Sequence, residues 1–346
     1  MHRMAEIIKS VDKTHKRLGN MTAVNILGAL AGKCVLNVAV AGTGKSTATN
    51  TVKQLFKDNV ITFDSITRNG LKYYQKELNG FRGVVIIDDI GKIDTEYTRI
   101  TTITTMAELT YSHEVKKSTN QIHLDISGFH GSALMNVQPV VMPRVVKRTD
   151  WDANIRDKTI RYYHLYRATE PTLTLPKVKL DSDIDITSVR PVKQDDPRLR
   201  ALMAEYKGLW SKARALQHLR DLVRALAAVD GRKRVKDEDF ALLAKILTPL
   251  KVEKYLLIKQ DLEGKKTFRH NYMCLLTEFI SYDVVTIDTI CDNYGVSKAT
   301  AYRILNIYHN EVLITPDKGQ RVILPTPSMK KIIDEVDIYK GGGACG

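Results

Sequence analysis

The sequence contains little of what marks a secreted or membrane-bound protein. It has four cysteines in 346 residues, and none of them forms a C-x-x-C pair. Cysteines so few and so scattered argue against a disulfide framework or a zinc site, and they favour a reducing compartment. No apolar run reaches the length that crosses a bilayer, and the first ten residues lack the apolar core of a signal peptide. We therefore expect a cytoplasmic protein with no membrane partner.

Acidic residues are also scarce relative to basic ones. The chain has 53 Lys and Arg residues against 39 Asp and Glu, which gives a formal net charge of +14 at pH 7. A balance this basic favours a polyanionic partner, with nucleic acid ahead of a membrane surface. The length leaves room for two or three domains with a sizeable core.

Short β-branched runs alternate with helical patterns up to about residue 170, which predicts a parallel α/β sheet. The predicted strands are Val35–Val40, Val60–Phe63, Val84–Ile87, Ala133–Val137 and Thr159–Leu165. A segment rich in Pro, Asp and Thr follows, and then a helical pattern begins. We predict a nucleotide-binding domain over residues 1–172, a linker and helical unit over 173–250, a third unit over 251–340 and a flexible tail over 341–346.

A phosphate-binding loop is predicted directly after the first strand. Residues 39–46 match G-x-x-x-x-G-K-[ST] except at Ala39, which replaces the first glycine. Glycines allow backbone N–H groups to face the phosphates, and the following helix contributes its N-terminal partial charge. We expect Lys45 to reach the β and γ phosphates and Ser46 to ligate magnesium. The nucleotide-binding residues are then Gly42, Thr43, Gly44, Lys45, Ser46 and Thr47, and the ligands are ATP and Mg²⁺.

An acidic pair ends the third predicted strand. Asp88 and Asp89 follow the apolar run that begins at Gly83, at the sheet edge where ligands bind in open α/β folds. Asp88 is expected to hold magnesium, and Asp89 is expected to orient and polarise an attacking water. We expect this strand and the P-loop strand to be neighbours in the sheet.

The third unit contains a helix-turn-helix over residues 287–305, in which Gly295 supplies the turn and Ser297 caps the second helix. This second helix would present Lys298, Thr300 and Arg303 to DNA. A two-stranded wing over residues 312–324 carries Lys318 and Arg321 at or near its tip. Together these elements resemble a winged-helix domain.

The order of these parts resembles the AAA+ ATPases that carry a C-terminal winged helix. The resemblance implies ATP hydrolysis within a homo-oligomeric ring or partial ring, such as a hexamer. The strand over 131–139 resembles the sensor-1 strand, so Asn136 becomes a catalytic candidate, with Gln138 on the same side. Arg156 is the first candidate for the arginine that completes a neighbouring subunit's site, and Arg161 is the second.

Two further segments carry the same resemblance. The hairpin over 113–126, with Lys116 and Lys117, resembles the DNA-gripping pore hairpin of minichromosome maintenance and superfamily-3 helicases. The helix over 214–225 resembles a lid, with Gln217 where a phosphate-sensing arginine is usual, so that Arg214 or Arg220 would have to substitute. The resemblance implies a replicative helicase or translocase acting on DNA. A replication initiator or loader and an ATP-switched DNA-binding regulator remain as alternatives, which sequence-selective binding would favour and fork unwinding would exclude.

Overall fold

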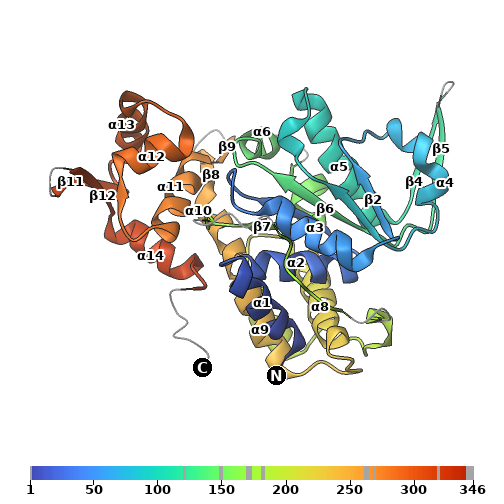
Figure 1. The fold of residues 1–346 in the computed structure, drawn as a ribbon. Coiled ribbons are helices and arrows are strands. Elements are labelled where there is room, and N and C mark those ends of the chain that lie inside the picture. Colours follow the sequence, from blue (N-terminus) through green and yellow to red (C-terminus); the bar gives the residue numbers. More distant parts are fainter. Residues whose placement is uncertain are drawn as a thin grey trace.

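The computed structural model describes residues 2–119, 122–147, 151–168, 174–180, 184–260, 265–268, 270–317 and 320–339. The predicted tail over 341–346 and Lys318 lie outside these residues. Within them, no helix combines the length and the apolar character that crossing a bilayer requires. Figure 1 shows an α/β region with a bundle of helices below it and a C-terminal unit at one end.

A five-stranded parallel sheet forms the centre of the α/β region, which confirms the predicted parallel α/β sheet. Its order is β2-β3-β6-β1-β7, and its strands are β1 Cys34–Val38, β2 Val60–Phe63, β3 Val84–Ile87, β6 Ser132–Val137 and β7 Thr159–Tyr163. The expectation that the P-loop strand and the acidic strand are neighbours is wrong. Strand β6 pairs with β1 on one side and with β3 on the other, so it separates them.

Helices cover both faces of this sheet because residues within one strand alternate between two cores. Leu36 and Val38 of β1 face the core that includes helix α5, Glu96–Ser112, whereas Val35 faces the opposite core. The opposite core contains residues of α2 and α3, which lie on the sheet, and of the helical bundle beyond them. The helices that contribute to this core are α1 Arg3–Thr14, α2 Gly19–Leu30, α3 Lys45–Phe56, α7 Pro197–Glu205, α8 Lys212–Val229 and α9 Asp237–Leu247. The bundle therefore packs on one face of the sheet.

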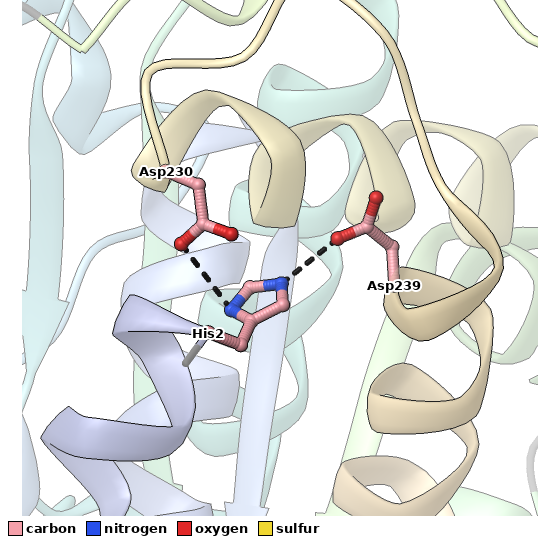
Figure 2. Close-up of side chains that lie close together, drawn as sticks. All are labelled: His2, Asp230 and Asp239. Atoms are coloured by element: carbon pink, nitrogen blue, oxygen red, sulfur yellow. Dashed lines mark hydrogen bonds and ion pairs between the residues drawn. The ribbon is translucent and has the colours of Figure 1, made fainter.

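An ion network ties the start of α1 to the turn between α8 and α9. His2 lies between two carboxylates, with Nε2 2.8 Å from Asp239 and Nδ1 3.4 Å from Asp230, as Figure 2 shows. Arg232 also bonds to both carboxylates. The ligand types of His2, Asp230 and Asp239 would suit a metal ion. However, Arg232 and His2 already contact all four oxygens of these two carboxylates, so the cluster is best understood as a polar network that joins distant segments.

A hairpin and two short helices border the α/β region. The predicted hairpin is present as β4 Val115–Thr119 and β5 Ile122–Ile126, and it projects from the end of the molecule opposite the C-terminal unit (Figure 1). The short helices α4 Gln75–Leu78 and α6 Met142–Val146 complete the region. Because the hairpin and the C-terminal unit lie so far apart, one ligand must be long to touch both.

The C-terminal unit contains the predicted helix-turn-helix. Gly295 ends α12 with a φ of 60°, and the Ser297 hydroxyl accepts the amide of Thr300 at the start of α13, as expected. A three-stranded sheet of order β10-β12-β11 packs beside these helices. The elements are α10 Glu253–Leu256, β8 Leu257–Gln260, β9 Lys265–Phe268, α11 His270–Ser281, β10 Val285–Thr286, α12 Ile287–Tyr294, α13 Lys298–Ile307, β11 Val312–Asp317, β12 Gln320–Pro325 and α14 Pro327–Val336.

Candidate active site

The loop between β1 and α3 has the geometry of a phosphate-binding loop. Gly42 and Gly44 have φ values of 72° and 84°, which residues with a Cβ rarely adopt. The Thr43 hydroxyl donates to the Val40 carbonyl at 2.9 Å and closes the turn. Helix α3 begins at Lys45, so its first amides point into the loop. The loop thus offers a partial positive charge and free amides to an anion.

Lys45 lies across this loop. Its ammonium donates to the carbonyls of Ala39 and Val40 at 2.8 and 2.9 Å. Burial lowers its pKa to about 8, although Asp89 and Asp88 act in the opposite direction. The side chain is therefore held as a partly desolvated cation beside two carboxylates, and a bound phosphate would strengthen its charged form.

The tips of β3 and β6 bring the predicted site residues Asp88 and Asn136 together. The Asn136 amide donates to Asp88 Oδ1 and to the Thr49 hydroxyl, each at 3.2 Å, and its oxygen accepts from Asn37 at 3.1 Å. Thr49 lies one turn after Ser46 on α3. Because β6 separates β1 from β3, Asn136 lies between the P-loop helix and the acidic strand and links them.

Asp89 is oriented by two donors. Its carboxylate accepts the Gly91 amide at 2.8 Å and the Gln138 amide at 3.3 Å. A Cβ on Gly91 would lie 2.9 Å from the side chains of both Asp89 and Gln138, so this position has no room for a side chain. A cavity of about 450 Å³ opens beside this carboxylate. Its lining comes from the tips of β2 and β3 and the start of α5, with Asp64, Ser65, Asp88, Asp89, Lys92, Ile93, Asp94, Thr95 and Thr98.

One cation at the P-loop was not predicted from the sequence. Arg167 follows β7, and its Nη1 donates to the Ala41 carbonyl at 3.1 Å. Its Nε and Nη2 lie 3.3 and 3.1 Å from Glu278 of α11. The signal was available in principle, because β7 pairs with β1 and parallel neighbours end at the same sheet edge. The pairing itself, however, depends on contacts distant in sequence.

The two arginines that were predicted to complete a neighbouring subunit's site bond within their own chain. Arg156 donates to Asp152 at 2.7 Å and to the carbonyls of Leu209 and Gly208. Arg161 is 1% exposed and forms a bidentate ion pair with Glu253, at 2.6 and 2.9 Å. Its other N–H groups donate to the carbonyls of Arg156, Thr159 and Leu209, so the Arg161 guanidinium is held inside the fold and is unable to reach another subunit.

The arginines of the predicted lid lie at the end of the sheet opposite the P-loop, so they are not placed to sense a phosphate there. Arg214 stacks 4.0 Å from the Tyr111 ring centroid and donates to Gln217 at 2.9 Å. Arg220 lies 3.6 Å from Asp221, which also pairs with Lys33 at 2.6 Å. Lys33 precedes β1 whereas the P-loop follows it, so the whole of β1 separates these residues from the loop.

The basic residues of the hairpin and the C-terminal unit have mostly local partners. Lys116 lies 3.8 Å from Glu114 and 3.9 Å from Asp125. Lys298 pairs with Asp288 at 2.8 Å, and Arg303 donates to Thr300 at 3.1 Å. The Arg321 guanidinium lies 5.6 Å from the ring centroid of Tyr302. The Lys117 side chain and all of Lys318 lie outside the described residues.

This geometry defines a P-loop nucleotide site, and a family comparison makes its class more specific. Residues 34–164 match the model of a family described as the tRNA ligase kinase domain. The matched segment begins with β1, ends one residue after β7 and contains the P-loop, Asp88, Asp89 and Asn136. A kinase domain is an enzyme domain that uses ATP, so the match indicates both properties for this segment. The match covers fewer than half of the 346 residues, and no curated protein matches the chain.

The match overturns several expectations drawn from the AAA+ resemblance. It indicates a kinase-type segment named for tRNA. This finding contradicts the expected helicase, initiator or loader, DNA-binding regulator and ring of AAA+ subunits. The match also contradicts the expected DNA partner. DNA contact was expected for Lys116, Lys117, Lys298, Thr300, Arg303, Lys318 and Arg321. The trans-acting role of Arg156 also loses its basis, because it presupposed such a ring. The resemblance misled because the order of P-loop and acidic strand is shared by proteins of many functions.

Proposed function

We propose that this protein is a polynucleotide kinase that transfers the γ-phosphate of ATP to a terminal hydroxyl of an RNA. The observation that carries the proposal is the match of residues 34–164 to the tRNA ligase kinase domain, over a segment that holds the whole P-loop site. The net charge of +14 supports a polyanionic acceptor.

The P-loop binds the phosphates of ATP in this proposal. The amides of Gly42–Thr47 and the start of α3 face the triphosphate, and Lys45 bridges the β and γ phosphates. Lys45 must exchange its bonds to the Ala39 and Val40 carbonyls for bonds to phosphate oxygens. This exchange is favourable because an anionic oxygen is a stronger acceptor than a neutral carbonyl.

The site also fits a magnesium ion. Ser46 supplies a hydroxyl and Asp88 a carboxylate, which are the oxygen ligands that magnesium prefers. Asn136 supports this fit, because it joins Asp88 to α3 through Thr49, one turn after Ser46. When bound, the ion would neutralise charge on the phosphates.

The acceptor hydroxyl enters the cavity beside Asp89. Its oxygen attacks the γ phosphorus, the bond from that phosphorus to the bridging oxygen breaks, and ADP leaves with the electron pair. The hydroxyl proton passes to the Asp89 carboxylate, which Gly91 and Gln138 hold in place. Asp64 lines the same cavity and is placed to orient the acceptor.

We keep the division at residues 172 and 250 as a proposal, with a winged-helix arrangement in the unit over 251–340. The order of helices α11, α12 and α13 with the sheet β10-β12-β11 supports this assignment. A cytoplasmic location is consistent with tRNA as the acceptor class.

The test is transfer of labelled γ-phosphate to RNAs that differ only at their ends. We expect label on an RNA with a free terminal hydroxyl and none on the same RNA with both ends blocked. Lys45→Ala should abolish transfer because ATP no longer binds. ATP consumption without label on any RNA end would contradict the proposal.

A further inference from the structure

Arg167 lies where three parts of the chain meet. Its Nη1 donates to Ala41 in the P-loop, and a Cβ on Gly42 would lie 3.9 Å from this nitrogen. Its backbone amide donates to the Ser281 hydroxyl at the end of α11, at 2.8 Å. The guanidinium also lies 5.3 Å from the ring centroid of Tyr294 on α12. One side chain thus joins the nucleotide loop to two helices of the C-terminal unit.

The partner of Arg167 is a completely buried carboxylate. Glu278 has no exposed surface, and it accepts hydrogen bonds from three side chains. Arg167 donates to Oε1 at 3.1 Å, Tyr294 donates to the same oxygen at 2.6 Å, and Asn293 donates to Oε2 at 2.6 Å. A buried carboxylate is costly unless it is paired, so this arrangement fixes the guanidinium firmly.

We propose that Arg167 binds the phosphates of the nucleotide and, through Glu278, couples occupation of the P-loop to the C-terminal unit. The inference rests on the proposed function only in taking the P-loop as a site for ATP. A guanidinium carries five N–H donors in a rigid fork. Glu278 uses two of the nitrogens, which leaves Nη1 directed at the loop.

The loop side of the guanidinium has a weak hydrogen-bond partner. Nη1 contacts a neutral carbonyl, that of Ala41, and the neighbouring Gly42 has no side chain to block approach. A phosphate in the loop is a stronger acceptor for this nitrogen. Arg167 can turn towards it without leaving Glu278, so no buried charge is left unpaired. Arg167 then supplies a second cation to the loop, from a position distinct from that of Lys45.

The coupling follows from the shared carboxylate. When Nη1 turns to phosphate, the hydrogen bonds that Glu278 shares with Tyr294 and Asn293 must adjust, and both residues belong to the end of α12. A cavity of about 380 Å³, lined by Val40 and Ala41 on one side and by α11 and α12 on the other, leaves room for this movement. Nucleotide binding should therefore order α11 and α12 against the P-loop.

The first test compares affinities for adenosine, AMP, ADP and ATP by calorimetry. For Arg167→Ala we expect an unchanged adenosine affinity and a loss that grows with the number of phosphates, to about 10- to 100-fold for ATP. Arg167→Lys should recover part of this loss, and Arg303→Ala, which removes an exposed arginine of α13, should change nothing. The affinity for ATP should also depend less on salt in Arg167→Ala than in the wild type.

Two outcomes would overturn the phosphate-binding role. An equal loss for adenosine and ATP would mean that Arg167 only supports the fold, and an unchanged ATP affinity would mean that it makes no phosphate contact. Because Arg167→Ala leaves Glu278 without its cation, the double variant Arg167→Ala, Glu278→Gln serves as a second test. It removes both charges, and it should show the same dependence on phosphate number.

The second test measures hydrogen exchange of residues 271–294 with and without ATP. We expect ATP to slow exchange in the wild type and in Arg303→Ala, but not in Arg167→Ala at saturating ATP. Protection that persists without Arg167 would refute the coupling. Neither test uses RNA, so a chain that passes both and fails to phosphorylate RNA would refute the proposed function alone.

Discussion

The charge of Lys45 should control the affinity for ATP over an accessible pH range. Burial lowers the pKa of this ammonium to about 8, below its ordinary value of 10.5. Bound phosphates favour the charged form and raise the pKa again. ATP binding above pH 8 therefore requires Lys45 to take up a proton, and the affinity must fall as the pH rises.

The size of the effect follows from the fraction of Lys45 that is protonated. At a pKa of about 8, about half of the empty protein is charged at pH 8 and about a tenth at pH 9. The dissociation constant for ATP should then be nearly flat up to about pH 7.5 and rise about tenfold for each pH unit above about 8.5. The phosphates of ATP are almost fully ionised above about pH 8, where the slope is expected, so they contribute little slope of their own there.

Calorimetry between about pH 7 and pH 9.5 measures this directly, because a linked proton also adds the ionisation heat of the buffer. Lys45→Arg is the matched control, since a guanidinium keeps its charge over the whole range and its profile should be flat. A wild-type profile that stays flat to pH 9.5, or a Lys45→Arg profile that rises equally, would refute the role given to Lys45.

Three other predictions follow from separate parts of the structure. Asp89→Asn should leave ATP affinity unchanged and slow phosphoryl transfer about 100- to 10,000-fold, because the proton acceptor is lost; single-turnover rates with normal ATP binding check this. Glu253→Gln leaves Arg161 buried without its anion, so chemical denaturation should show a loss of about 3–5 kcal/mol, and a loss below about 1 kcal/mol would contradict it. Burial raises the pKa of Asp239, but hydrogen bonds from its partners outweigh burial and hold the pKa at about 2, below the ordinary 3.8. Because the folded pKa is depressed, this carboxylate stabilises the fold above about pH 4, and the contribution disappears as the pH falls towards 2; Asp239→Asn should lack this part of the acid dependence in denaturant titrations.

The strands and the phosphate loop could be predicted because their signals are local. A β-branched run, two glycines, a lysine and a helix pattern lie within about twenty residues, and the structure places β1, the loop and α3 accordingly. The turn at Gly295 is equally local, since a left-handed residue followed by a serine cap needs no distant partner.

The order of strands in the sheet could not be predicted in the same way. Asn136 contacts Asp88 only because β6 lies between β1 and β3, and nothing in either segment specifies that position. Pairing in a parallel sheet is settled by the cores on both faces, which include α2, α3 and α5. The sequence therefore predicted which residues line the sheet edge, but not which of them are neighbours.

The arginines show the same limit. Arg167 reaches Glu278 across 111 positions of the chain, and the sequence around neither residue marks the contact. Arg161 looks like a candidate for a polar site, yet its side chain packs inward because β7 presents it to Glu253. A charged residue near a motif indicates little about function until the direction of its side chain is known.

The proposed function requires that the γ-phosphate goes to RNA and not to water. The most direct measurement follows ADP and labelled RNA together in one reaction with limiting RNA that carries free terminal hydroxyls. We expect one phosphate on RNA for each ADP formed, and an end to ADP formation when the RNA ends are used up. ADP that accumulates at the same rate with and without RNA, with the label recovered as inorganic phosphate, would contradict it.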